Sequence, residues 1–349
     1  MRLRDLGIAP GHHPTGPHNA ITDVPGVRVG HTTLVEGEAV RTGVTAIHPH
    51  AGSALRDRCP AAIAVLNGSG EITGRSQVDE HGLLETPIVL TNTLSVGVAH
   101  RATVDWVVRE EGLADDFVIP IVSETYDGFL NDIRGQHVRP EHVHAALDGA
   151  TSGPVAEGNV GGGTGMALFQ LKGGIGTSSR RLTLGGEDFT VGVLVQGNFG
   201  RRHHLLVDGR PVGREHPDEL LPVRAPGREG SVVVIVATDI PLSDRQLARL
   251  TRRGMLGVSR TGGVAGHTSG DLLLAFSNAE RVRVPRGKDQ VFVDARFLHD
   301  AHIDPVFEAV IEATEEAILN AMVAAETMSG RDGYVLHALP HAWLAAQTR

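Results

Sequence analysis

The chain of 349 residues carries 32 lysines and arginines against 41 aspartates and glutamates, a formal net charge of -9. With 4% aromatic residues, this balance argues against nucleic acid as a partner, because such a surface needs basic and stacking side chains. A single cysteine, Cys59, excludes an internal disulfide. No apolar run reaches the roughly 18 residues of a membrane span, and the first 20 residues lack a secretory signal, so we expect a cytoplasmic protein without membrane contact.

Short β-branched segments recur between glycine-rich turns, and segments with helical spacing of apolar residues follow several of them. We expect strands at residues 61–66, 86–91, 117–122 and 191–195, and helices at 96–111 and 139–147. A last long helix is predicted with Asp304 as its N-cap, Pro305 in its first turn and Gly330 as its stop. These elements predict a mixed α/β fold.

The segment 201–230 carries four prolines among many charged residues, which predicts an exposed connector. Ser231 follows it and opens residues 232–236, five β-branched side chains in a row that are typical of a buried strand. A further helix is predicted after this strand, with Ser243 as N-cap and Gln246 in the capping-box position.

Two features that suggest a cofactor are better explained without one. The histidine-rich stretches, His12-His13, His203-His204 and His142-Val143-His144, have no carboxylate at ligand spacing, and HExxH is absent from the sequence, so we expect no metal. The glycine-rich stretch 158–165 lacks both the P-loop ending and the dinucleotide-binding spacing. We interpret it as a structural or acyl-group-accommodating loop.

The junction Gly230-Ser231 has the features of an N-terminal nucleophile, although a plain turn is the alternative. If this bond were broken, Ser231 would carry a hydroxyl and a free α-amine, whose pKa of about 8 leaves part of it unprotonated near neutral pH. That amine can act as the base for its own hydroxyl, directly or through a water. The preceding glycine leaves room for attack on its carbonyl, and the strand behind Ser231 would hold the nucleophile in place.

Blocks of sequence spread over nearly the whole chain resemble one family in order and spacing. With them the chain resembles the L-aminopeptidase D-amidase/D-esterase family of self-processing N-terminal-nucleophile hydrolases, which includes the β-peptidyl aminopeptidases. The blocks are residues 21–31 (ITDVPGVRVGH), 42–45 (TGVT), 82–98 (GLLETPIVLTNTLSVGV), 124–132 (ETYDGFLND), 154–180, 195–200 (VQGNFG), 230–239 (GSVVVIVATD), 269–277 (SGDLLLAFS) and 315–333.

The resemblance implies one catalytic unit, residues 1–349, with the layered α-β-β-α sandwich that the family shares with ornithine acetyltransferase-like enzymes. It implies self-cleavage at Gly230-Ser231 into chains 1–230 and 231–349, which stay associated in a tetramer. The cleaved enzyme would hydrolyse N-terminal residues from short peptides, amides or esters with a free amine, through an acyl-enzyme on Ser231 and without a cofactor.

The resemblance also implies residue roles. Asn198 matches the oxyanion-hole residue, where an amide donor stabilises developing negative charge, and Tyr126 matches a hydrogen-bonding tyrosine of the active site. Glu124 matches the carboxylate that receives the amino group of the substrate, on the same side as Tyr126 if the segment is extended. Ser269 and Asp271, also two residues apart, match the pair that contacts the nucleophile and its amine.

Three points stay open at this stage. The β-peptide specialists of the family carry glutamate where this chain has Asp271, which leaves the preference for α- or β-peptides undecided. An acyltransferase with the same nucleophile is one alternative function. An uncleaved, non-catalytic protein that binds a ligand at residues 158–165 is the other. His267 is interpreted as a loop residue, because the family uses the terminal amine as its base.

Overall fold

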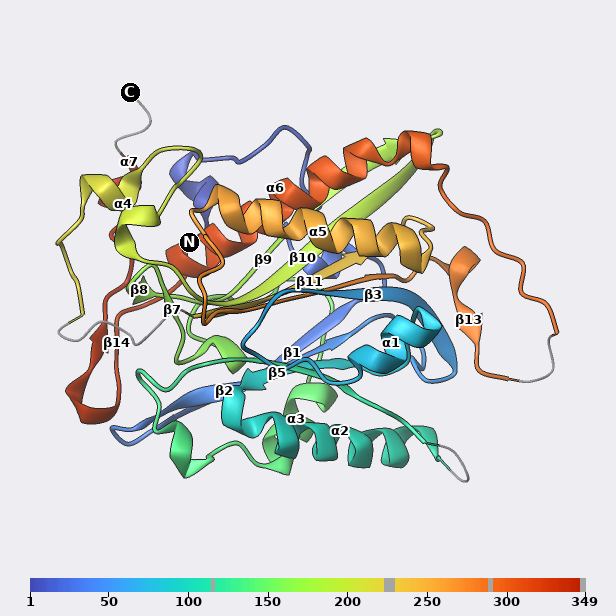
Figure 1. Ribbon diagram of the computed structural model, residues 1–349, viewed down its shortest axis with the longest axis horizontal. Helices are drawn as coiled ribbons and strands as arrows, with labels where there is room; N and C mark the ends of the chain where they lie inside the picture. The colour runs from blue at the N-terminus through green and yellow to red at the C-terminus, as the bar shows by residue number, and fades with distance from the viewer. Residues whose placement is uncertain (114–116, 223–229, 288–290, 346–349) are drawn as a thin grey trace.

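The computed structural model describes residues 1–113, 117–222, 230–287 and 291–345, and two β-sheets lie face to face at its centre (Figure 1). In the described residues the smaller sheet has four strands in the order β1-β2-β5-β6. Helices α2 (Val96–Glu111) and α3 (Pro140–Asp148) pack against it. The strands are β1 (Arg28–Glu36), β2 (Val40–His48), β5 (Ile88–Asn92) and β6 (Ile121–Thr125).

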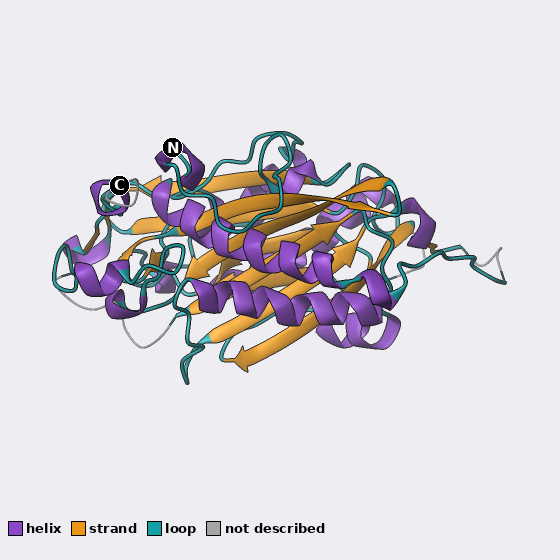
Figure 2. Cartoon of the chain, turned by 90° about the horizontal axis from the view of Figure 1, so that it is seen from above, coloured by secondary structure: helices purple, strands orange, loops and turns teal. Residues whose placement is uncertain are grey.

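The larger sheet has the strand order β13-β3-β12-β11-β10-β9, with β4 paired to β3. Helices α5 (Asp244–Arg260) and α6 (Asp304–Val323) run side by side across one face of this sheet (Figure 2). The strands are β3 (Asp57–Gly68), β4 (Leu83–Leu84), β9 (Gly174–Leu184), β10 (Glu187–Asn198), β11 (Ser231–Thr238), β12 (Gly270–Ser277) and β13 (Val284–Pro285).

Shorter elements surround the two sheets. They are α1 (Arg75–His81), α4 (Val212–Glu215), α7 (Ala342–Ala345), the hairpin of β7 (Ala167–Leu168) and β8 (Leu171–Lys172), and the hairpin of β14 (Met328–Ser329) and β15 (Val335–Leu336). None of the helices in the described residues is both long and apolar enough to cross a membrane.

Strand β11 lies in the middle of the larger sheet, antiparallel to β10 and parallel to β12. Val232 and Val234 belong to the hydrophobic cluster that includes α5 and α6, whereas Val233 and Ile235 belong to the cluster shared by the two sheets. Because both faces of the strand are buried, the sequence can be apolar at every position instead of alternating. Ser231 begins this rigid, fully buried strand.

Most of the predicted elements are confirmed, and so is the mixed α/β fold. Strands cover the predicted segments 61–66, 191–195 and 232–236, and α2 and α3 occupy the predicted helices. The capping box is also present, since the Gln246 N–H donates to Ser243 Oγ at the start of α5.

The predicted start of the strand at 117–122 and both predicted ends of the last long helix are wrong. The strand predicted at 117–122 begins only at Ile121, because Pro120 has no N–H for the ladder. Asp304 is the first residue of α6 and not its N-cap. The same helix ends at Val323, well before Gly330. Just after this end, Asn159 hydrogen-bonds both the N–H and the carbonyl of Glu326.

The exposed connector predicted at 201–230 is also wrong in its first part. Leu205, Val207 and Val212 are fully buried in the core cluster beneath α5 and α6. The Arg202 guanidinium is buried as well and donates to the carbonyl oxygens of His216 and Glu219. The many charged residues of this segment therefore gave no indication that these apolar side chains are buried. Residues 223–229 lie outside the described residues.

Candidate active site

The hydroxyl of Ser231 lies at the beginning of β11, on the face that points toward the smaller sheet. The register establishes this, because Val233 and Ile235, two and four residues further, belong to the cluster between the sheets. The residue is only 4% exposed. Its Oγ accepts a hydrogen bond of 3.2 Å from the Tyr126 backbone N–H. The predicted nucleophile is therefore fixed between the two sheets.

Asn198 lies directly opposite Ser231 in the antiparallel pair of β10 and β11. Residues opposite each other in such a pair project from the same face with neighbouring Cβ atoms. The Asn198 Oδ1 accepts a hydrogen bond of 2.9 Å from the Ala167 N–H. That bond orients the amide and leaves its NH₂ group as the donor on the other side.

The peptide unit before Ser231 is closely surrounded by backbone. The Gly230 carbonyl oxygen accepts a hydrogen bond of 3.2 Å from the Gly270 N–H. A Cβ at position 230 would lie 1.4 Å from the Asn198 carbonyl oxygen, so only glycine fits there. The need for space at Gly230 was predicted from the sequence, whereas the Gly270 N–H was not.

The regular strand on which the same-side prediction for Glu124 and Tyr126 depends includes only Glu124. Strand β6 ends at Thr125, so the extended segment stops before Tyr126. The Tyr126 ring is 49% exposed and lies against Gly128, where a Cβ would be 2.4 Å from its Oη. Its contact with Ser231 is made by the backbone N–H and not by the phenol.

Glu124 lies on β6 and is buried, with 2% of its surface exposed. Its carboxylate accepts hydrogen bonds from the Glu71 N–H, at 3.1 Å, and from the Thr93 hydroxyl. A Cβ on Gly70 would touch both Glu124 Oε1 and the Gly270 Cα, which locates the carboxylate beside Gly270. Burial raises its pKa, and within the described residues no cationic side chain pairs with it.

Ser269 and Asp271 lie beside the predicted cleavage site, on β12 or just before it. Asp271 pairs in register with Val232, so its side chain projects from the face opposite to Ser231. Ser269 Oγ donates to Asp271 Oδ1 at 2.8 Å, and Asn67 Nδ2 contacts Oδ2 at 3.1 Å. Burial raises the pKa of Asp271. The two side chains thus contact each other, and Asn67 is an additional partner that the sequence did not reveal; their contact with the Ser231 amine stays a prediction.

The glycine-rich stretch 158–165 is structural and not a phosphate cradle. Its N–H groups are used inside the protein, for example Gly161 N–H to Thr33 Oγ1 and Gly162 N–H to Thr45 Oγ1. The buried Lys172 ammonium donates to the carbonyls of Met166 and Gly173 near this stretch. His267, expected in a loop, is exposed in a turn.

A buried polar cluster beneath the site escaped the sequence analysis. Asp127 is fully buried and accepts a hydrogen bond of 3.1 Å from Asn131 Nδ2. Burial raises its pKa to about 7. Gln196 Nε2 nearby bonds the Thr125 hydroxyl at 2.9 Å, which links β10 to β6. The only sequence signal for these residues was their position inside two of the matching blocks.

The two cavities and the one group of potential metal ligands in the described residues do not include the residues around Ser231. Two surface cavities of about 400 and 600 Å³ have no predicted site residue in their walls. The one group of potential metal ligands in the described part of the chain is His12, His13 and Glu308. It includes no residue of the Ser231 site.

Comparison with known families decides the classification. The model of peptidase family S58 matches residues 19–336, which include all the residues assembled around Ser231. The chain belongs to peptidase family S58. The resemblance to the L-aminopeptidase D-amidase/D-esterase family is thereby confirmed.

Individual S58 relatives match over nearly their full length. The beta-peptidyl aminopeptidase BapA of Sphingosinicella microcystinivorans is 44% identical, over 99% of this chain and 91% of that protein. A Burkholderia sp. beta-aminopeptidase structure has 46% identity and a TM-score of 0.92, over 99% and 98% of the two chains. The L-aminopeptidase D-Ala-esterase/amidase of Ochrobactrum anthropi has 44% identity and a TM-score of 0.92, over 99% and 97%, and is described as a variant of the Ntn hydrolase fold.

Proposed function

We propose that this S58 protein is an aminopeptidase whose nucleophile is Ser231, freed by self-cleavage at Gly230-Ser231. The observation that carries the proposal is the position of Ser231. Its Oγ accepts a hydrogen bond from the Tyr126 N–H, and the residue lies directly opposite Asn198 on the neighbouring strand. The aminopeptidase names of the BapA, Burkholderia and Ochrobactrum relatives support the same activity.

In the self-cleavage step, Ser231 Oγ attacks the Gly230 carbonyl carbon. The Gly230–Ser231 C–N bond breaks as an ester C–O bond forms, and the nitrogen takes up the proton that the hydroxyl loses. Water then hydrolyses the ester and leaves a Gly230 carboxylate and a Ser231 amine. The Gly270 N–H, 3.2 Å from the Gly230 oxygen, is placed to stabilise negative charge as it develops there.

In the turnover reaction, the freed Ser231 amine takes the proton of its own hydroxyl, which attacks the substrate carbonyl. The Asn198 NH₂ group, oriented by the bond from Ala167, donates to the oxyanion. The leaving amine or alcohol departs with a proton, and water hydrolyses the acyl-enzyme. Ser269 and Asp271, beside residues 230–232 in the sheet, orient the Ser231 amine.

Glu124 supplies the specificity for a free amino group. A buried carboxylate without a cationic partner favours a ligand that brings one, because burial penalises an unpaired charge. Short peptides, amides and esters with an N-terminal ammonium and a small first residue are the proposed substrates. Tetramer formation and kinship with ornithine acetyltransferase-like enzymes stay predictions from the resemblance, and cytoplasmic location stays a prediction from the sequence.

Replacement of the nucleophile tests this function. Ser231→Ala is expected to abolish hydrolysis of an aminoacyl p-nitroanilide, measured as released chromophore, because one hydroxyl serves both steps. Retained turnover would refute the nucleophile. An added acceptor amine separates hydrolysis from the acyltransferase alternative, since amide product in place of free acid would identify a transferase.

A further inference from the structure

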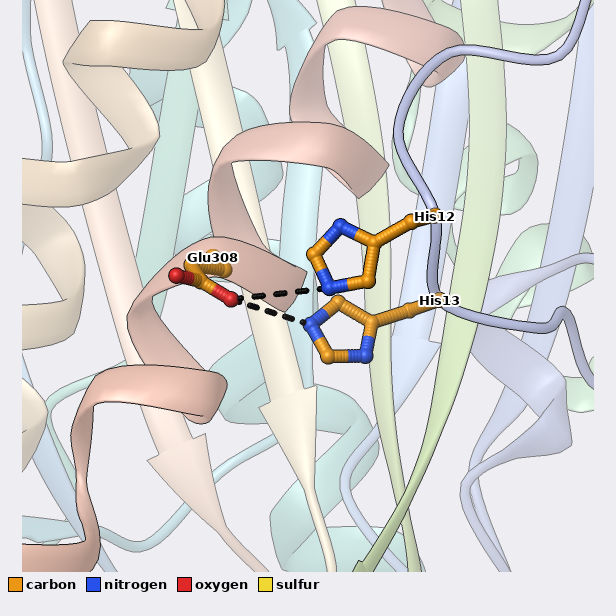
Figure 3. Close-up of side chains that lie close together, drawn as sticks. All are labelled: His12, His13 and Glu308. Carbon is orange, nitrogen blue, oxygen red and sulfur yellow. Dashed lines mark ion pairs between the residues drawn. The ribbon is translucent and has the colours of Figure 1, made fainter.

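Two histidines of the N-terminal segment meet a glutamate of α6 at the protein surface (Figure 3). The His12 and His13 rings point toward the Glu308 carboxylate, and their centroids are 4.2 Å apart. Their ring nitrogens and one carboxylate oxygen all lie within 4.8 Å of one another. Nearly three hundred residues separate these side chains in the sequence, so no spacing pattern revealed the carboxylate that the sequence analysis had sought.

The distances between these atoms match those between ligands of one ion. Glu308 Oε2 lies 3.5 Å from His13 Nε2 and 3.7 Å from His12 Nε2. Ligands about 2.1 Å from a tetrahedral zinc ion are about 3.4 Å apart. His13 Nε2 is buried but makes no hydrogen bond to any described residue. This buried nitrogen therefore has no hydrogen-bond partner, and a bound metal ion would take that place.

A second carboxylate prepares His12 for metal binding. Glu312 Oε1 lies 3.1 Å from His12 Nδ1, on the side of the ring opposite to Glu308. Glu312 accepts hydrogen bonds from the His12 N–H, the His13 N–H and the Arg180 guanidinium, donors that favour an ionised carboxylate. A proton on Nδ1, beside this carboxylate, would leave the Nε2 lone pair facing Glu308, and a carboxylate in that position is a usual neighbour of a metal-bound histidine.

The backbone that carries the two histidines is fixed before any ion arrives. Glu312 accepts hydrogen bonds from the N–H groups of both His12, at 3.0 Å, and His13, at 3.2 Å. Gly11 has φ of +79°, and a Cβ there would lie 1.9 Å from the Glu312 Cδ. Arg180 Nε donates a hydrogen bond of 3.0 Å to Glu312 Oε2. The backbone of the two histidines therefore has little conformational freedom left to lose on binding.

We propose that His12, His13 and Glu308 bind one divalent transition-metal ion of the zinc type, with water completing the coordination. Two imidazoles and a carboxylate suit zinc and its neighbours better than magnesium or calcium, which prefer oxygen ligands alone. Both histidines precede residue 19, where the family match begins, whereas Glu308 lies within the matched residues 19–336, so the match covers only one of the three proposed ligands.

The site does not depend on the proposed cleavage but gains a role from it. If the chain is cut after Gly230, His12 and His13 belong to the larger chain and Glu308 to the smaller one. A bound ion would then tie the two chains together at the surface. This consequence rests on the proposed function, whereas metal binding does not.

Isothermal titration calorimetry with zinc chloride on untagged, chelator-treated and dialysed protein tests the proposal. We expect one equivalent to bind, and Glu308→Gln and His12→Asn each to weaken binding by at least about tenfold. Both replaced side chains are exposed, so the variants should fold. Glu141→Gln on α3 and the double variant of the other adjacent pair, His203→Gln with His204→Gln, are matched controls expected to bind like the parent.

Three results would refute the proposed metal site. Absence of binding by the parent protein would do so, and so would equal affinity in the Glu308 variant or an equal loss in the histidine controls. Ser231→Ala protein is expected to bind zinc with parent affinity whether or not it is cut. Failure of the proposed cleavage and failure of the metal site are thus separate outcomes.

Discussion

At the residue scale, the proposed function makes specificity for amino groups depend on the carboxylate of Glu124. Glu124→Gln keeps the shape and the acceptor for the Glu71 N–H but removes the charge. We expect kcat/KM on an aminoacyl amide to fall by about 100-fold or more, as when a buried charge loses its partner. An ester substrate that lacks the amine should lose far less.

Steady-state kinetics on the two substrates measures this difference. Glu80→Gln, which changes an exposed carboxylate on α1, is the matched control and should leave both substrates unaffected. Equal losses on the amide and the ester would remove Glu124 from the amino-group role.

The buried Asp127 predicts a pH dependence of stability. Burial raises its pKa from 3.8 to about 7, so the unfolded chain loses this proton at lower pH than the folded protein does. Its contribution to stability is full below pH 3.8 and is lost as the pH rises toward about 7. Asp127→Asn mimics the protonated form, so the free energy of unfolding should fall less steeply with pH, by up to about 1.4 kcal/mol per pH unit.

Urea unfolding at several pH values between 4 and 7 gives this slope for parent and variant. Asp79→Asn, at an exposed aspartate of α1, controls for the loss of any carboxylate. A parent and an Asp127→Asn protein with the same slope would show that the buried group does not titrate as the structure indicates.

Single residues of the site differ in what the sequence could reveal. Ser231 stood out because a hydroxyl follows glycine where a charged segment meets an apolar strand. Asn198, Glu124 and Asp271 were named through the resemblance. The Gly270 N–H could not be found, because a backbone donor has no sequence signature and depends on the register of β11 and β12.

At the element scale, the β7–β8 hairpin depends on one buried ammonium. Lys172 Nζ donates to the carbonyls of Gly173, Met166 and Gly163 at 2.7, 2.9 and 3.3 Å. Lys172→Met keeps much of the apolar stem but leaves these oxygens without their donor. We expect the free energy of unfolding in urea to drop by about 3 kcal/mol or more. A loss below about 1 kcal/mol would contradict the role assigned to the ammonium.

The hairpin also carries the Ala167 N–H that orients Asn198. Folded Lys172→Met protein should therefore have a lower kcat as well as lower stability. Gln170, in the turn of the same hairpin, accepts a hydrogen bond from the Arg202 N–H and serves as the control position. Gln170→Met should lower stability while changing kcat less than Lys172→Met.

Helices and buried strands followed from local patterns, whereas their ends did not. The apolar run of β11 and the capping box of α5 have a direct physical cause in the chain itself. Just beyond the end of α6, the backbone of Glu326 is hydrogen-bonded by Asn159, which is distant in sequence. Contacts of that kind, like those that bury Arg202, arise only when the whole chain is folded.

At the scale of the whole molecule, the proposed cleavage would leave two interleaved chains. In the larger sheet, β11 and β12 from the smaller chain lie between β10 and β3 from the larger one. Helices α5 and α6 of the smaller chain contact strands of both, α5 with β3, β11 and β12 and α6 with β9 and β10. Continuous strand pairing and a shared core therefore predict that the two chains stay together after the bond breaks.

The most direct test is the intact mass of the purified protein under denaturing conditions, with N-terminal sequencing of any fragment. The account predicts chains of about 24 and about 13 kDa, in proportion to 230 and 119 residues of a 36.9 kDa protein, the smaller beginning Ser231-Val232-Val233. Ser231→Ala should give one chain of 36.9 kDa. An uncut parent protein, or a Ser231→Ala protein that is still cut after Gly230, would contradict the account.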